Sequence, residues 1–181
     1  MNKAELKDVE LRLIAELMKN CRRSDRELAK AIGVSQPTVS RFLSKLKKMG
    51  YFQEFVLIPN FQKLGYKIMA LTFVKTKKGF KPETVEKALK IGEEIFQKGP
   101  FEMVMAERGT GFGHDAVTIS YHQDYSSFRK FLEWIKQFDF LDLENLDAFL
   151  IDLEDKVHYR SLTFQTMAKH VLKLGSKQKF E

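Results

Sequence analysis

Residues 24–50 read SDRELAKAIGVSQPTVSRFLSKLKKMG and contain two helix-start signals around a single glycine. Ser24 followed by Glu27 forms a capping box, in which the hydroxyl and the carboxylate each accept a hydrogen bond from a backbone amide at the start of a helix. Gly33 can adopt the left-handed backbone that ends such a helix. Ser35 caps a second helix, and Pro37 is tolerated in its first turn. The spacing therefore predicts two short helices joined by a tight turn.

Apolar residues at helical spacing extend this pair to three helices. The second helix of the pair buries Val39, Phe42, Leu43 and Leu46, and Gly50 closes it. An upstream helix with the same period carries Leu6, Val9, Leu13, Ile14 and Leu17. Three helices with a tight turn between the second and the third make a helix-turn-helix unit, whose third helix enters the major groove of DNA.

The third helix has polar and basic side chains on the surface that its apolar stripe leaves outward. Gln36 suits an adenine edge and Arg41 can bind guanine with two hydrogen bonds. The lysines further along suit backbone phosphates, which give affinity without sequence information. We predict contacts with double-stranded DNA from Ser35, Gln36, Thr38, Ser40, Arg41, Ser44, Lys45 and Lys48. The alternative is a three-helix bundle whose solvated basic face contacts proteins.

The positive charge of the chain is concentrated near its beginning. Residues 1–65 hold 13 basic and 7 acidic residues, a balance of +6 within a formal net charge of +7. Residues 66–181 hold 18 basic and 17 acidic residues, so they are close to neutral. This asymmetry indicates a front domain that meets a polyanion and a rear domain with a different task.

The rest of the 181 residues predicts an α+β domain. Residues 51–58 read as a wing strand that connects the domains. Beyond it, the pattern predicts a strand at 67–76, a helix at 82–97, strands at 101–106 and 116–121, a helix at 125–138 and a strand at 145–153. This βαββαβ order is ferredoxin-like. We expect domains at residues 1–58 and 67–160, joined by a linker at 59–66. Residues 161–181 should form a C-terminal helix, over 162–174, and a tail.

Composition excludes several classes of protein. No apolar run approaches the roughly 20 residues of a membrane span, and no signal-peptide core follows the charged start. Cys21 is the only cysteine, so an intrachain disulfide is impossible and a cytoplasmic location is expected. We expect no cofactor and no metal site.

The helix-turn-helix stretch, the segment PNFQKLGY at residues 59–66 and the βαββαβ order together resemble the Lrp/AsnC regulators. The resemblance covers residues 6–160. It implies a transcriptional regulator whose rear domain pairs subunits through its sheet and binds an amino acid between subunits. We therefore expect a homodimer or a higher oligomer and a small-molecule effector.

The segment GTGFGHDA departs from the family pattern between the second and third strands of the rear domain. The family has a glycine, an acid, an aromatic residue and a second acid there, whereas this loop is longer and has one acid. A pocket for a carboxylate and an amine could form from the amides of Gly109, Gly111 and Gly113 and the carboxylate of Asp115. The alternative is a hairpin in which the glycines permit a tight turn.

Three other functions compete with DNA-dependent regulation. GTGFGHDAV partly resembles an RNA-recognition motif, but His114 and Asp115 stand where stacking aromatic residues are needed. Lrp-like enzymes of tetrapyrrole metabolism need clustered His, Arg and Tyr, and the four histidines here, His114, His122, His158 and His170, are scattered. An assembly or ligand-sensing protein without DNA binding would not need the basic third helix. We therefore expect no enzyme activity.

Overall fold

The structure is a computed structural model that describes residues 6–78, 85–99 and 102–177. The chain forms two compact units, which we call the helical unit (Met1–Ile58 and Tyr159–Glu181) and the sheet unit (Pro59–His158). The chain therefore leaves the helical unit once and returns to it at the end. None of the helices in the described ranges is both long and apolar enough to cross a bilayer.

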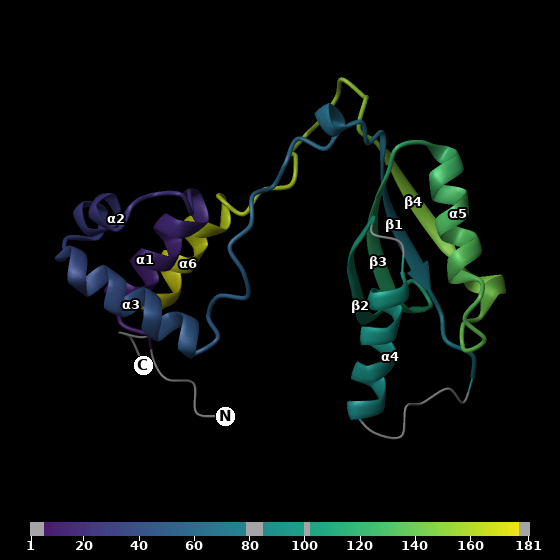
Figure 1. Ribbon diagram of the computed structural model, residues 1–181, viewed down its shortest axis with the longest axis horizontal. Helices are drawn as coiled ribbons and strands as arrows, with labels where there is room; N and C mark the ends of the chain where they lie inside the picture. Colours follow the sequence, from purple (N-terminus) through teal and green to yellow (C-terminus); the bar gives the residue numbers. More distant parts are fainter. Residues whose placement is uncertain (1–5, 79–84, 100–101, 178–181) are drawn as a thin grey trace. The chain divides into compact units, whose positions relative to one another are not determined.

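The helical unit contains α1 (Asp8–Lys19), α2 (Asp25–Ile32), α3 (Gln36–Lys48) and α6 (Met167–Lys177), shown in Figure 1. The first three enclose one core, which confirms the predicted apolar stripes. Its buried members are Leu13, Leu17, Leu28, Ala29, Ile32, Val39 and Leu46.

A second buried face of α1 carries the C-terminal helix. Leu11 and Ala15 are one helical turn apart, on the side of α1 opposite Leu13 and Leu17, and both are buried. α6 packs against α1, with Ala168 fully buried, and Figure 1 shows α6 in yellow beside α1 in purple. The C-terminal helix expected at residues 162–174 begins at Met167 and belongs to the helical unit.

The predicted wing strand at residues 51–58 is wrong. This segment has no strand in the structure, and Phe55, Val56, Leu57 and Ile58 are all exposed. A strand exists only when a neighbouring strand takes up its backbone hydrogen bonds, and no ladder in the described residues includes this segment. The segment is a connection without helix or strand, and its apolar side chains are exposed.

The sheet unit contains β1 (Ile68–Val74), α4 (Val85–Lys98), β2 (Met103–Gly111), β3 (His114–His122), α5 (Tyr125–Ile135) and β4 (Asp147–Asp152). Short 3-10 turns lie at η1 (Gln62–Leu64) and η2 (Leu143–Asn145). The strands pair antiparallel in the order β2-β3-β1-β4, which confirms the ferredoxin-like α+β fold. Residues 82–84 and 101 of the expected elements lie outside the described residues.

One face of the sheet is covered by α5. Ala70 and Val74 of β1 point to this side and share a core with three residues of α5, Phe128, Phe131 and Ile135. The covered face also contains polar residues at alternating positions of the strands, because Thr72, Ser120 and His122 are fully or almost fully buried.

The opposite face of the sheet has no helix on it in the described residues. Its central side chains are apolar and half-buried or exposed, and none of these belongs to a core cluster of the described residues. Two exposed acids lie on its edge strands, Glu107 in register with Val117 and Asp147 in register with Phe73. We call this surface the bare face; it consists of Met69, Leu71, Phe73, Val117, Ile119, Phe149 and Ile151.

One end of the bare face is closed by the segment expected as the linker, residues 59–66. The ring of Phe61 stacks on that of Tyr121 with 3.7 Å between centroids, and Tyr66 meets both rings edge-on. Tyr121 is consequently 4% exposed. These three rings fix the start of the sheet unit next to β3.

Candidate nucleic-acid interface

Local sequence signals fix the α2–turn–α3 geometry. Ser24 Oγ accepts a hydrogen bond from the Glu27 amide, and Glu27 Oε2 accepts one from the Ser24 amide at 2.7 Å. Gly33 ends α2 with φ of 74°, where a side chain would be strained. Ser35 occupies the cap position of α3, but its hydroxyl bonds to the Thr38 hydroxyl at 2.8 Å instead of capping the backbone. The predicted capping box and glycine stop are therefore confirmed.

The apolar edge of α3 determines which side chains point outward. Val39 and Leu46 are fully buried, while Phe42 and Leu43 are half-buried against the same core. Of the eight residues predicted to contact DNA, only Thr38 is half-buried. The exposed ones are Ser35, Gln36, Ser40, Arg41, Ser44, Lys45 and Lys48.

Arg41, Ser44 and Lys48 form the centre of this outward surface. They lie at i, i+3 and i+7, on the side of α3 opposite Val39 and Leu46. The Arg41 guanidinium carbon lies 5.8 Å from the Phe42 ring centroid. Neither Arg41 nor Lys48 forms an ion pair within the part of the chain that the structure describes. Two cations on this central stripe are thus available to an anionic partner.

Two predicted contact residues are instead bonded to acids of the helical unit. Ser40 Oγ donates to Asp25 Oδ2 at 2.5 Å, which joins α3 to α2. Lys45 Nζ lies 2.6 Å from Glu10 Oε1, which joins α3 to α1. The DNA contacts themselves stay a prediction for all eight residues.

Glu10 is a residue of the site that sequence reasoning missed. Its side chain is 0% exposed, and its second oxygen accepts a hydrogen bond from the Lys7 amide at 2.9 Å. Burial by itself raises the pKa of Glu10, but the bonds from Lys45 and Lys7 outweigh it and hold the pKa below its ordinary value. The signal was present, because Glu10 precedes Leu13, Ile14 and Leu17 at i+3, i+4 and i+7, so an acid stands within an apolar stripe.

The predicted effector segment is a tight hairpin. Gly109 and Gly111 lie within β2, and β3 begins at His114, so only Phe112 and Gly113 form the turn. Both turn residues have positive φ, 51° and 79°, as two-residue hairpins with primed turns require. The expected longer loop is therefore wrong, because β2 continues past a register shift between Arg108 and Gly111 until Gly111 pairs with His114.

Asp115 is engaged by the protein itself. Its Oδ2 accepts hydrogen bonds from the Thr76 amide at 2.9 Å and the Thr76 hydroxyl at 2.7 Å. These bonds lower the pKa of Asp115. The carboxylate therefore fastens the start of β3 to the chain beyond β1.

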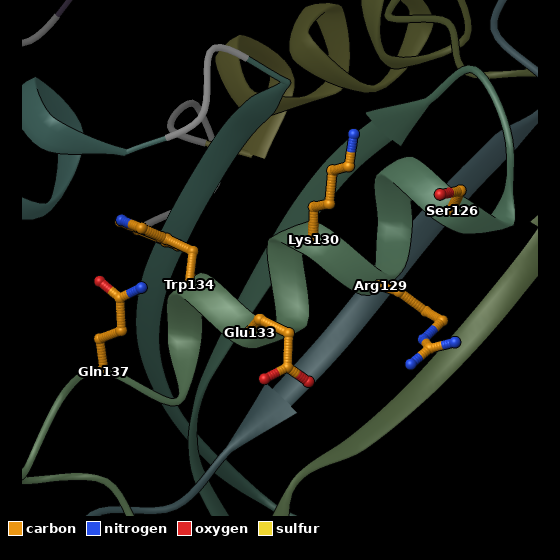
Figure 2. A pocket seen from close by; sticks show the side chains of 6 residues that line it. All are labelled: Ser126, Arg129, Lys130, Glu133, Trp134 and Gln137. Atoms are coloured by element: carbon orange, nitrogen blue, oxygen red, sulfur yellow. The ribbon is translucent and has the colours of Figure 1, made fainter.

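The surface of α5 contains a shallow depression, shown in Figure 2. It is lined by Ser126, Arg129, Lys130, Glu133, Trp134 and Gln137. All except Trp134 are exposed, and Figure 2 shows the side chains spread along the helix without converging on one point. The depression has no arrangement that would orient a small molecule.

The histidines do not form a catalytic cluster in the described residues. His114 and His122 stand at opposite ends of β3, and His170 lies on α6 in the helical unit. His114 Nε2 lies 3.1 Å from Asp147 Oδ2, and His122 Nε2 lies 2.8 Å from Ser120 Oγ. The described residues contain no group of three or more side chains that could hold a metal ion.

Comparison with known proteins identifies the helix-turn-helix independently. A family model described as winged helix-turn-helix DNA-binding matches residues 6–53. The HTH-type transcriptional regulator Ptr1 of Methanocaldococcus jannaschii is 30% identical over 124 residues, which cover 68% of this chain and 77% of that protein. An uncharacterised HTH-type transcriptional regulator of Pyrococcus furiosus is 39% identical over 87 residues; the match spans 48% of this chain and 58% of that protein.

Solved structures share the fold over most of the chain. AsnC of Escherichia coli superposes with a TM-score of 0.64 at 19% identity, covering 87% of this chain and 98% of that one. A transcriptional regulator of Neisseria meningitidis in complex with L-Met gives 0.68 at 18% identity, covering 90% and 99%. Taken together with the helix-turn-helix and the ferredoxin-like sheet, these matches show that the chain belongs to the Lrp/AsnC family of DNA-binding transcriptional regulators.

Proposed function

We propose that this chain is a sequence-specific regulator that reads double-stranded DNA by placing α3 in the major groove. The observation that carries the proposal is the outward stripe of Arg41, Ser44 and Lys48 on the second helix of a helix-turn-helix. The concentration of positive charge in residues 1–65 supports it, because a basic surface attracts the phosphate backbone.

Each residue of the stripe suits a different part of the DNA. Arg41 suits the O6 and N7 acceptors of guanine, and Gln36, at the start of the helix, suits the N6 and N7 atoms of adenine. Ser44 and Lys48 lie further along α3, where the helix approaches the phosphates. Arg41 therefore carries sequence preference, while Lys48 carries affinity for any duplex.

We also propose that the protein acts as a homodimer joined through the bare face of the sheet unit. Seven apolar side chains on one continuous sheet surface form the kind of patch that marks an interface. A second copy of the same face supplies a matching apolar surface about a two-fold axis. Two copies of α3 would then read two half-sites.

We propose that the sheet unit responds to an amino acid, as the Lrp/AsnC resemblance implies. The Neisseria meningitidis relative was solved with L-Met, which supports an amino acid as the class of effector. Asp115 already accepts two hydrogen bonds from Thr76, so we place the effector between subunits rather than on the hairpin. Thermal shift with each common amino acid tests this: a ligand whose effect survives in Asp115→Ala supports the placement, and its loss in that variant contradicts it.

Selection of binding sites from a random-sequence duplex pool tests the DNA-reading function. The full-length protein should enrich one sequence motif. Arg41→Ala should then cost about 1–3 kcal/mol on the selected duplex and relax the preference at one base position. If no motif is enriched, or if Arg41→Ala selects the same motif with the same affinity, α3 does not read the sequence.

A further inference from the structure

Among the acids of α1, only Glu10 is fully buried, and its carboxylate bonds to Lys45 of α3. Glu10 is 0% exposed, and both of its carboxylate oxygens have partners: Oε2 accepts from the Lys7 amide at 2.9 Å, and Oε1 from Lys45 Nζ at 2.6 Å. Lys45 is the only cation that forms an ion pair with Glu10 among the described residues. The Lys45 side chain as a whole is 44% exposed.

The charge of Glu10 makes Lys45 hard to release. A buried carboxylate that loses its cation keeps its desolvation cost without the attraction that offsets it. A phosphate contact at the protein surface is screened by salt and water, so it returns less than the buried pair gives up. This balance favours retention of the Glu10–Lys45 pair when α3 approaches DNA.

The position of Lys45 on α3 agrees with a structural task. Ser40 and Lys45 lie on opposite flanks of the stripe formed by Arg41, Ser44 and Lys48. Ser40 is bonded to Asp25 of α2, and Lys45 to Glu10 of α1. Each flank of α3 is thus held by one acid from a neighbouring helix, which fixes the rotation of α3 about its axis and the direction of the central stripe.

We infer that Lys45 is a positioning residue that Glu10 holds in place, and that the phosphate contacts of α3 come from its other lysines, Lys47 and Lys48. The inference rests on the proposed function and assigns to Lys45 a role that its exposure and charge alone do not indicate. It has a measurable consequence, because only cations that neutralise phosphates contribute to the salt dependence of DNA binding.

The test is the salt dependence of full-length protein binding to a fixed mixed-sequence 30-base-pair duplex, followed by fluorescence anisotropy. Lys48→Met should reduce the slope of log affinity against log salt by about 0.9 per protomer. The double variant Glu10→Gln/Lys45→Met, which leaves no buried charge unpaired, should keep the parent slope. Glu10→Gln alone frees Lys45 and should steepen the slope by about 0.9 per protomer.

A matched control separates this effect from the general loss of one negative charge. Asp8→Asn removes an exposed acid from the same helix and should leave the slope unchanged. The inference is overturned if the double variant flattens the slope as much as Lys48→Met does, or if Glu10→Gln does not steepen it beyond Asp8→Asn. If Lys48→Met and Lys47→Met also leave the slope unchanged, α3 does not meet the duplex and the proposed function fails as well.

Discussion

The helical unit and the sheet unit treat their apolar surfaces differently. In the helical unit, both apolar faces of α1 are covered, one by α2 and α3 and the other by α6. In the sheet unit, α5 covers one face of the sheet and the other stays bare. The comparison teaches that the first three helices and α6 bury the apolar faces of α1 within one chain, whereas the sheet unit leaves one apolar face exposed, which we propose a second copy covers.

The largest expected effect comes from placing a charge on the bare face. Leu71 pairs with Ile119 on one side and Phe149 on the other, so Leu71→Asp puts two carboxylates near the two-fold axis of the proposed dimer. We expect the dimer dissociation constant to rise about a thousandfold, which corresponds to about 4 kcal/mol. Analytical ultracentrifugation measures it.

Leu89→Asp is the matched control, because Leu89 lies on α4 and is 63% exposed. That variant should dimerise as the parent does. If Leu71→Asp also dimerises as the parent does, the sheet unit does not use its bare face, and the contrast between the two units disappears.

The second effect tests whether α6 completes the helical unit. Ala168→Asp places a carboxylate without a partner in the contact between α6 and α1, where Ala168 is fully buried. We expect the helical unit to lose about 3 kcal/mol of unfolding free energy. If detaching α6 from α1 costs less free energy than burying the carboxylate, α6 should detach instead. Chemical denaturation and limited proteolysis of the C-terminal segment report the two outcomes.

Lys169→Asp introduces the same side chain at the exposed neighbouring position and should change stability by less than about 0.5 kcal/mol. Equal stability and equal protease resistance in both variants would show that α6 contributes nothing to the helical unit.

The smallest effect concerns pH and the covered face of the sheet. Burial between the sheet and the rings of Phe128 and Phe131 lowers the pKa of His122, although Glu102 and Asp124 partly oppose this. The folded state therefore favours neutral His122. Its stabilising contribution is present above the ordinary histidine pKa of about 6.5 and is lost as pH falls below it, by at most about 1.4 kcal/mol per pH unit.

Denaturation of the parent and of His122→Asn between pH 7.5 and pH 5 measures this contribution. The sheet unit of the parent should lose more stability over that range than the variant does. Parallel pH profiles for the two proteins would mean that His122 titrates as it does in the unfolded chain.

The helical unit could be predicted largely from sequence because its signals are local. The Ser24 capping box, the left-handed Gly33 and the stripe from Val39 to Leu46 each act within a few residues. The partner of the second face of α1 could not be predicted, because α6 is about 150 residues away along the chain. Nothing in Leu11 and Ala15 indicates which distant helix will cover them.

In the sheet unit, the order of elements was predictable and the ends of strands were not. Gly109 and Gly111 have weak strand propensity, so the sequence indicated a loop, but the ladder with β3 extends β2 to Gly111.

Residues 51–58 of the helical unit show the reverse case. They have a strand-like composition, yet they form no strand because pairing depends on a neighbour that local sequence does not specify.

The two polar contacts that hold α3, Asp25–Ser40 and Glu10–Lys45, were also beyond the sequence. Ser40 and Lys45 have the residue types of DNA contacts, and periodicity placed them on the outward half of the helix. Only the positions of α1 and α2 show that an acid reaches each of them.

Footprinting of the full-length protein on the duplex obtained by site selection tests the central claim most directly, because it requires both α3 and the bare face. We expect two protected half-sites with centres about 10 base pairs apart, or a multiple of that spacing, related by a two-fold axis. Protection of a single half-site, or of two half-sites by a Leu71→Asp protein that is monomeric in ultracentrifugation at the same concentration, would contradict the claim.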